Sequence, residues 1–437
     1  MKRILFAFSL MAATTASFAQ VAKPMEDVNK VIDNTVDSLN KAMTARIQPG
    51  TSRKGNNPVL FLIGNSTMRN GTLGNGNNGQ WGWGYYEHEF FDANKITVEN
   101  QALGGMSSRT FYNRLWPDVR KGIKAGDWVI ISIGHNDNGP YDSGTIKETG
   151  VKETVYTYGE YMRKYINDCR ALGAHPILMS LTPRDAYDEN DKIVRVNKTF
   201  GLWAKQVAEQ EGVPFVDLNE ISAAKLDSYG HWKEKYHFFT DHIHTSRFGA
   251  MMNARSAAEG LAESKDPNLA PLQAMMINVA LPVENFKREP GKPVVFFTGD
   301  STVKNADKDE DGMWGWGSQA YTIFNPKKIT CVNAAKAGRS SRSYLNEGRW
   351  DKVYNSLQPG DYVLIEFGHN DICSLTDKKM RGSIPCAKDT CHVYQMEESK
   401  QYEVVYSFGW YLKKFIQDVR EKGATPILVS LTPRNEW

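Results

Sequence analysis

Five residues in the N-terminal part of the chain have the types and spacing needed to hydrolyse an ester. Ser66 follows the apolar run VLFLI and a Gly-Asn pair, which would present its hydroxyl on a tight turn at a strand end. Asp241 and His244 stand three positions apart, so the carboxylate could hold Nδ1 of the imidazole and leave Nε2 free to take the serine proton. Gly105 could offer a backbone N–H, and Asn136 a side-chain amide, to a developing oxyanion. Together these groups make up an acyl-transfer site.

Each of these residues also has a purely structural explanation. A serine after a strand is often a helix N-cap, an asparagine such as Asn136 often bonds its own backbone in a turn, and Gly105 could serve turn geometry alone. The segment DHIH could bind a metal, with His242 between the two other residues. We favour catalysis because all the parts occur in order, and no further His or carboxylate cluster accompanies DHIH. We therefore expect no metal and no cofactor, and we expect His242 to be a solvated loop residue.

The same sequence blocks occur twice. GNST, WGWG, GHND and LTPR are followed later by GDST, WGWG, GHND and LTPR, and Ser66 and Ser301 lie 235 positions apart (301−66). A period of that size indicates a duplicated domain rather than a solenoid. The second copy carries Ser301, Gly338 and Asn370, but it reaches Trp437 without an Asp-x-x-His segment. We expect this copy to be inactive as it stands, and we expect the chain to continue beyond Trp437.

Alternating strand and helix patterns predict the elements that position these residues. Short apolar runs at 59–63, 97–100, 128–133, 176–181 and 214–218 indicate strands, and residues 156–173 and 197–212 indicate helices that close on glycine. Several strands are continuously apolar, which is typical of a parallel sheet covered by helices on both faces. The fold class is therefore α/β, an α/β/α sandwich present in two copies. In such sheets ligands bind at the carboxyl ends of the strands, where each motif falls.

The chain divides into five predicted parts. Residues 1–19 have Lys2 and Arg3, an apolar stretch and small residues ending at Ala19, which predicts a signal peptide and an exported protein, periplasmic or extracellular. An N-terminal helix and linker follow at 20–57, the complete domain at 58–264, a linker at 265–292 and the truncated second domain at 293–437. The second copy adds a polar insertion at 374–400 on the loop face.

The composition excludes several classes of partner. A formal net charge of +3, with 24% charged and 41% hydrophobic residues, favours neither nucleic acid nor a membrane surface. The five cysteines are too few for a disulfide scaffold, although Cys386 and Cys391 lie close enough in sequence to pair. None of their spacings is that of a zinc site.

These blocks, in this order, resemble the SGNH (GDSL-like) hydrolases, and most closely their rhamnogalacturonan acetylesterase branch. The resemblance implies a flavodoxin-like three-layer sandwich with about five parallel strands. It implies Ser66 as nucleophile, His244 as general base and Asp241 as the residue that orients it. The oxyanion hole would comprise the N–H groups of Ser66 and Gly105 and the Asn136 side chain.

Two residues depart from the family pattern. Asn65 stands where the family usually has aspartate, as at Asp300 in the second copy, and we expect a changed local charge rather than lost activity. Met106 stands where the family usually has arginine, as at Arg339, which removes a cation beside the site.

The resemblance implies removal of O-acetyl groups from a pectic polysaccharide such as rhamnogalacturonan, with acetylated plant cell-wall polysaccharide as partner. Some aromatic side chains near the loop face could stack on sugars or could pack on the sheet: Trp81, Trp83, Tyr85, Tyr86 and Trp116. Two alternatives remain open. One is another SGNH esterase, such as a xylan acetylesterase, lipase or thioesterase, and the other is an inactive carbohydrate-binding module.

Overall fold

A computed structural model describes residues 38–137, 154–196, 198–229, 236–279, 284–305 and 312–434. The predicted signal peptide lies outside these residues. The described residues up to 47 belong to one unit and those from 48 onward to another. In the first unit, residues 38–44 are helical, within the stretch for which a helix was predicted.

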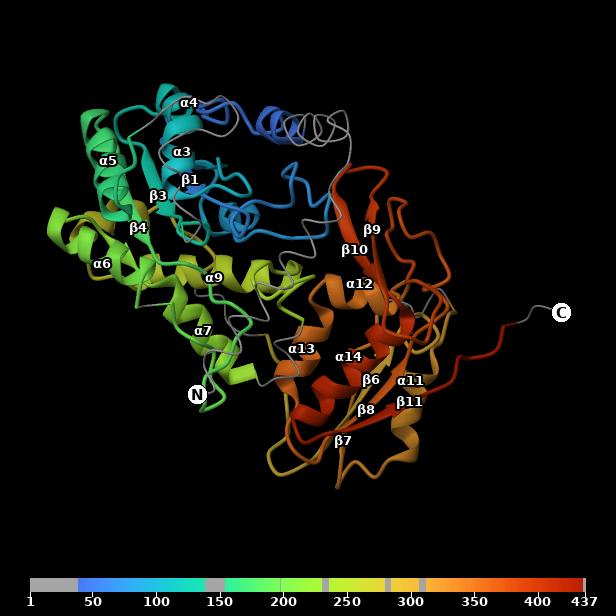
Figure 1. Cartoon of the computed structure of the whole chain (residues 1–437). Coiled ribbons are helices and arrows are strands. Elements are labelled where there is room, and N and C mark those ends of the chain that lie inside the picture. The colour runs from blue at the N-terminus through green and yellow to red at the C-terminus, as the bar shows by residue number, and fades with distance from the viewer. Residues whose placement is uncertain are drawn as a thin grey trace, which may run out of the picture. The chain divides into compact units, whose positions relative to one another are not determined.

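The first copy is built on a parallel five-stranded sheet (Figure 1). Its strands are β1 (Val59–Gly64), β2 (Thr97–Asn100), β3 (Trp128–Ser132), β4 (His175–Met179) and β5 (Phe215–Val216). Their order is β2-β1-β3-β4-β5, with β1 pairing in parallel to both β2 and β3. This is the flavodoxin-like order, so the predicted fold class is confirmed.

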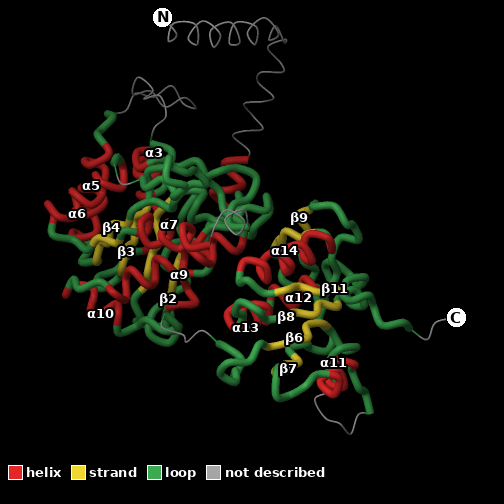
Figure 2. Tube along the Cα trace, turned by 90° about the horizontal axis from the view of Figure 1, so that it is seen from below, coloured by secondary structure: helices red, strands yellow, loops and turns green. Residues whose placement is uncertain are grey.

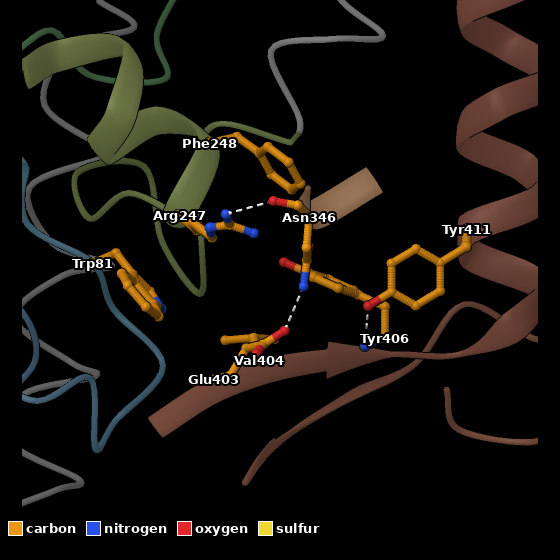
Figure 3. Close-up of a pocket in the computed structure, with 8 residues that line it drawn as sticks. All are labelled: Trp81, Arg247, Phe248, Asn346, Glu403, Val404, Tyr406 and Tyr411. Atoms are coloured by element: carbon orange, nitrogen blue, oxygen red, sulfur yellow. Dashed lines mark hydrogen bonds between the residues drawn. The ribbon is translucent and has the colours of Figure 1, made fainter. Parts of the chain in front are cut away.

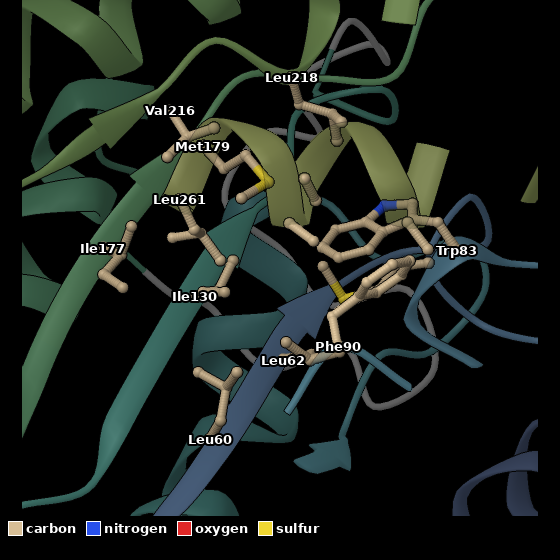
Figure 4. Packing of buried hydrophobic residues seen from close by; sticks show 14 of the residues in the cluster. Leu60, Leu62, Trp83, Phe90, Ile130, Ile177, Met179, Val216, Leu218 and Leu261 are labelled. Atoms are coloured by element: carbon tan, nitrogen blue, oxygen red, sulfur yellow. The ribbon is translucent and has the colours of Figure 1, made fainter. Parts of the chain in front are cut away.

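Helices cover both faces of this sheet (Figure 2). One face carries α3 (Ser108–Arg114), α4 (Trp116–Gly122), α5 (Tyr158–Ala171) and α6 (Phe200–Glu211). The other face carries α7 (Leu218–Tyr229), α9 (Arg247–Glu263) and the short helices η1 (Trp83–Tyr85) and η2 (Glu87–Phe90). Alternate strand residues such as Leu60, Leu62 and Ile130 are fully buried against the α9 side (Figure 4). Burial on both faces explains why the strands are apolar throughout.

The second copy repeats the same topology with one strand fewer. Its strands are β6 (Val294–Gly299), β7 (Thr330–Asn333), β8 (Tyr362–Glu366) and β11 (Thr425–Leu428), in the order β7-β6-β8-β11. Its helices are α11 (Trp316–Gln319), η5 (Ala320–Ile323), α12 (Ser341–Asn346), α13 (Arg349–Ser356) and α14 (Phe408–Glu421). Among the described residues no strand pairs with the outer edge of β11, and Leu428 in β11 is 50% exposed. In the first copy the corresponding strand β4 is covered by β5, and Met179 in β4 is 1% exposed.

The end of the polar insertion and the residues directly after it form an antiparallel hairpin, which the sequence did not reveal. Its strands are β9 (Cys391–Gln395) and β10 (Tyr402–Tyr406). Cys391 begins β9, and neither it nor Cys386 is paired; all five cysteines lie in the described part and are free thiols.

The two predicted linkers are packed segments where the structure describes them. Gly50 and Ser52 donate backbone N–H groups to the Glu99 carboxylate of β2. Within 265–279, η3 (Pro267–Leu269) and α10 (Ala270–Gln273) bury Leu269 and Leu272 in the first core. The apolar residues in the middle of 265–292 indicate such packing from the sequence alone, whereas the polar composition of 48–57 gave no sign of its contacts.

A buried ion pair anchors the start of each sheet in the same way. Arg53 donates both terminal nitrogens to the Asp127 carboxylate, at 2.7 and 2.6 Å, and that carboxylate also accepts the N–H of Val59 at 2.9 Å. In the second copy Arg288 pairs with Asp361, which accepts the N–H of Val294. The repeat therefore extends to residues that lie before each first strand.

We predict that Arg53→Ala lowers the free energy of unfolding by about 3 kcal/mol, because it leaves the fully buried Asp127 carboxylate without its cation. Urea denaturation measures this change. Lys121→Ala is the control, since Lys121 and Asp118 are exposed, and it should shift stability by no more than about 0.5 kcal/mol. Equal shifts in the two variants would show that the buried pair contributes no more than a surface pair.

Candidate active site

Ser66 lies on a tight turn directly after β1. The Asn65 side chain accepts hydrogen bonds through Oδ1 from the N–H and the hydroxyl of Thr67, at 3.1 and 3.0 Å. The Asn65 carbonyl then accepts the N–H groups of Met68 and Arg69, which closes one helical turn. This turn holds the half-buried Ser66 hydroxyl at the carboxyl end of the central strand.

The loop before α9 brings the predicted base and carboxylate to Ser66. We call residues 236–247 the catalytic loop. His244 Nε2 lies 2.8 Å from Ser66 Oγ, and His244 Nδ1 lies 2.7 Å from Asp241 Oδ2. Asp241 Oδ1 accepts the backbone N–H groups of Ile243 and His244, each at 2.8 Å. The three side chains thus form one continuous chain of hydrogen bonds.

The local turn also sets the charge state of Asp241. Its partial burial acts to raise the pKa, but hydrogen bonds from the backbone and ring of His244 and from the Ile243 N–H outweigh it and hold the pKa below the ordinary value. The stabilisation given by this ionised carboxylate is therefore complete above its ordinary pKa. It is lost only as the pH falls through the lowered value.

The predicted oxyanion donors Gly105 and Asn136 lie on the loops that follow β2 and β3. Leu103 donates its N–H to the Gly64 carbonyl at 3.2 Å, which places the following glycines beside the Ser66 turn. Gly105 has φ of +76°, a conformation that glycine adopts without strain. Its N–H and that of Ser66 meet no acceptor among the described residues. The Asn136 amide donates to the Met106 carbonyl at 3.1 Å, which fixes its orientation and leaves one N–H to give.

Asp137 joins the two loops that carry these donors, a role that the sequence interpretation missed. Its carboxylate accepts the backbone N–H of Ser108 and, through a short hydrogen bond, the Ser108 hydroxyl at the start of α3. Burial raises the pKa of Asp137 and these two bonds lower it, with a net rise. In the second copy Asp371 binds Ser341 in the same way. The repetition of this pair in both copies was the signal available in the sequence.

Both tryptophans of the WGWG segment in the first copy are buried, and Trp81 supports the catalytic loop. The backbone N–H of Trp81 donates to the Thr245 carbonyl at 2.9 Å, and the Thr245 hydroxyl donates to the Trp81 carbonyl at 2.6 Å. Trp83 and Trp116 are 0% and 1% exposed. The expectation that these rings could stack on a polysaccharide is therefore wrong for the tryptophans and for the buried Tyr86, since packing on the sheet removes their faces from solvent. Tyr85 alone is half-buried.

His135 stands beside the site without joining the hydrogen-bond chain. Its Nε2 lies 3.2 Å from Thr182 Oγ1. Burial, with the nearby charges of Arg184 and His244, lowers the pKa of His135 to about 3. The imidazole is therefore neutral at ordinary pH, and a cationic side chain, Arg184, lies in its neighbourhood. Arg184 was not singled out from the sequence.

The second copy holds its matching groups in a different setting. Gly338 has φ of +75°, and Asn370 donates to the Arg339 carbonyl at 3.1 Å, as in the first copy. The exposed Ser301 hydroxyl, however, has no hydrogen-bond partner within the described ranges. At the end of β8 the buried Glu366 replaces Ser132 and accepts the Thr302 hydroxyl at 2.9 Å.

Asn65 leaves one buried group unsatisfied in the first copy. Its Oδ1 keeps the turn, but its Nδ2 is buried and has no partner in the part of the chain that the structure describes. In the second copy the matching Asp300 Oδ2 accepts from the Asn370 amide, at 3.4 Å. An aspartate therefore links the nucleophile turn to the oxyanion asparagine, and Asn65 does not.

The described residues contain neither a cluster of metal ligands nor a membrane-spanning helix. No group of three or more His, Cys, Asp or Glu side chains is placed there to hold a metal ion. His242 is exposed, and its carbonyl accepts the N–H of Asp185. No helix within the described ranges is both long enough and apolar enough to cross a membrane.

The chain matches one protein family in both copies, and it matches individual proteins over less than half of its length. The profile of the GDSL-like lipase/acylhydrolase family matches residues 60–254 and again residues 295–428. A probable rhamnogalacturonan acetylesterase of Bacillus subtilis, YesY, is 32% identical over 211 residues, which are 47% of this chain and 92% of that protein. A rhamnogalacturonan acetylesterase of Emericella nidulans is 35% identical and matches 33% of this chain and 54% of its own length. The solved structure of YxiM from Bacillus subtilis has a TM-score of 0.41 at 28% identity, covering 47% of this chain and 56% of its own.

We predict that Asp241→Asn lowers kcat for p-nitrophenyl acetate by about 10³- to 10⁴-fold with little change in KM. The asparagine Oδ1 would keep the two backbone hydrogen bonds, but its amide would face His244 Nδ1 as a donor. The imidazole would then carry its proton on Nε2, where it cannot accept the Ser66 proton. Asp188→Asn is the control, because Asp188 caps a turn in the same manner away from the site. A loss of less than tenfold in Asp241→Asn would contradict this role.

We also predict that Asn65→Asp raises kcat about two- to tenfold, the equivalent of one added hydrogen bond to the Asn136 amide. The second copy shows that a carboxylate fits this position. Steady-state kinetics with p-nitrophenyl acetate measure the effect. Asn65→Ala is the comparison, since it also removes the Oδ1 bonds to Thr67 and should lower both kcat and stability. An Asn65→Asp enzyme with unchanged kcat would show that the Asn136 amide needs no such anchor.

Proposed function

Because the chain belongs to the GDSL-like lipase/acylhydrolase family, we propose that it is an esterase that removes O-acetyl groups from rhamnogalacturonan through a serine acyl-enzyme. The family predicted from the sequence is confirmed by the profile, which matches more than half of the chain. The enzyme class, an ester hydrolase of the acetylesterase kind, is confirmed together with it.

The hydrogen-bond chain from Ser66 through His244 to Asp241 is the observation that carries the proposed mechanism. Ser66 Oγ attacks the acetyl carbonyl while His244 Nε2 takes its proton, and Asp241 stabilises the imidazolium that forms. His244 then gives the proton to the leaving sugar oxygen. A water molecule, activated by the same imidazole, releases acetate and restores the serine.

The groups around Ser66 support stabilisation of the tetrahedral intermediate. The backbone N–H groups of Ser66 and Gly105 meet no acceptor among the described residues, and the Asn136 amide has one N–H left to donate. Donors that are already fixed stabilise a developing oxyanion without reorganisation, and removing one such donor costs about 10²- to 10³-fold in kcat.

Two observations support a pectic substrate. Two relatives bear the name rhamnogalacturonan acetylesterase: one, named as probable, is matched over 92% of its own length and the other over 54%. Rhamnogalacturonan is acidic, and the charge of Arg184 lies near enough to His135 to help lower the pKa of that imidazole, although Met106 stands where the family usually has arginine. We therefore assign to Arg184 the attraction of a substrate carboxylate that Met106 cannot provide.

The inactive carbohydrate-binding module is the less favoured alternative, since a binding module needs no aligned Ser-His-Asp chain. Another SGNH esterase remains the main alternative, because it would use the same catalytic residues on a different ester.

For the location we propose export to the periplasm or the cell exterior. That proposal rests on the basic, apolar and small-residue pattern of residues 1–19.

We predict that the enzyme releases acetate faster from acetylated rhamnogalacturonan than from acetylated xylan, and prefers acetyl to longer acyl esters. Each added methylene should cost about 1 kcal/mol or more in a closed acetyl pocket. Ser66→Ala should abolish release, whereas the matched Ser301→Ala should leave it unchanged. Faster release from xylan would identify a xylan esterase. Activity that survives in Ser66→Ala would place catalysis elsewhere, including in the second copy.

A further inference from the structure

We propose that the second copy is a positioning element for the catalytic loop of the first copy. It would hold the segment that carries Asp241 and His244 at hydrogen-bonding distance from Ser66. This inference rests on the ester hydrolysis proposed above, but not on the identity of the polysaccharide. Three separate contacts lead to it, one at each end of the catalytic loop and one near its middle.

The first contact holds the start of the loop. The ring of Tyr236 packs edge-on against Trp410 of α14, with ring centres 5.0 Å apart. On the same helix, Lys414 Nζ lies 4.5 Å from the centre of the Tyr236 ring. Lys414 is itself fixed by a buried ion pair with Asp418 at 2.7 Å. The start of the catalytic loop therefore lies on a rigid, buried cluster of the second copy.

The second contact holds the end of the loop (Figure 3). Arg247 donates to the carbonyl of Asn346, the last residue of α12, at 3.0 Å. The Asn346 amide donates to Glu403 of the hairpin at 2.7 Å, and Glu403 pairs with the fully buried Arg342 at 2.9 Å. The residue three positions after His244 is thus tied to a buried polar network in the second copy.

The third contact acts through the glycine-rich loop, residues 70–80. The N–H of Tyr402 in β10 donates to the Asn75 carbonyl at 2.8 Å. Gly79 lies between the two copies: a Cβ at that position would be 2.6 Å from the Phe239 ring and 2.8 Å from Val393 in β9. The β9–β10 hairpin therefore packs against the glycine-rich loop at the place where this loop contacts the catalytic loop.

The catalytic loop needs outside support because its reacting part is open to substrate. The side chains of His244 and Asp241 are 21% and 37% exposed, and Thr240 has φ of +70°, which is unusual for a β-branched residue. Internal hydrogen bonds run from the Phe239 N–H to the His244 carbonyl and between Thr245 and Trp81. A displacement of about 1 Å in a catalytic group is enough to cost about 10²-fold in rate. Contacts at the two ends of the loop oppose that displacement without covering the site.

Two variants from opposite sides of the contact test the proposal in the full chain. Trp410→Ala removes the ring beneath Tyr236, and Arg247→Ala removes the bond to Asn346. We expect each to lower kcat for p-nitrophenyl acetate about tenfold or more, with KM changed less than about twofold. Hydrogen exchange of the amides in residues 236–247 should become faster in both. Trp410→Phe and Arg247→Lys keep a ring and a donor and should recover most of kcat.

Trp314→Ala is the matched control, since Trp314 is an exposed tryptophan of the second copy, 57% accessible, and should leave kcat unchanged. The small ester separates the possible failures. A wild-type enzyme inactive on it would contradict the esterase itself, whereas one active on it but not on polysaccharide would contradict only the substrate. An unchanged kcat in Trp410→Ala or Arg247→Ala overturns the positioning role. The positioning role is also overturned if the loss of activity equals the fraction of unfolded protein measured by circular dichroism.

Discussion

The hydrogen bond between Ser66 Oγ and His244 Nε2 joins residues 178 positions apart, and the first copy is organised around making it. Ser66 is fixed early in the chain, on the turn after the central strand β1. His244 arrives only after four further strands have been added to the sheet and immediately before α9 crosses its face. In a parallel sheet all strands end at the same edge, so groups far apart in sequence meet there. The packing of α9 on β1 and β3 then sets how far the catalytic loop reaches.

The two copies use one framework with different chemistry at its edge. Both begin with a buried arginine–aspartate pair, both turn at a glycine with positive φ, and both tie an aspartate to a serine at the start of a helix. The first copy places a neutral Asn65 next to Ser66, and its His244 forms a hydrogen bond with the Ser66 hydroxyl. The second copy has two buried carboxylates here, Asp300 in the corresponding turn and Glu366 at the end of β8, and both accept the Thr302 hydroxyl.

A division of labour between the copies follows from a physical conflict in the first one. The His-Asp pair has to be accessible to a polymer, so its own domain cannot bury it, yet the reaction needs it fixed to within about 0.5 Å. Buried networks in the second copy supply rigidity from outside, through Trp410, Asn346 and the β9–β10 hairpin. Through these contacts the second copy has a structural role, although its Ser301 has no hydrogen-bond partner among the described residues.

The sequence by itself determined the strands, their parallel arrangement and the residue types of the site. Continuous apolar runs such as VLFLI have one stable place, the interior of a covered sheet, and the motifs at their ends follow from that. Ser66, His244 and Asp241 were identified because order and spacing are local properties of the chain. Only the tertiary structure decided what depends on packing between distant segments. It buried Trp81 and Trp83, paired Asp137 with Ser108, and folded the end of the polar insertion into a hairpin with the residues directly after it. It also set Tyr236 and Arg247 against the second copy, because a contact's free energy depends on both partners and a sequence pattern shows only one of them.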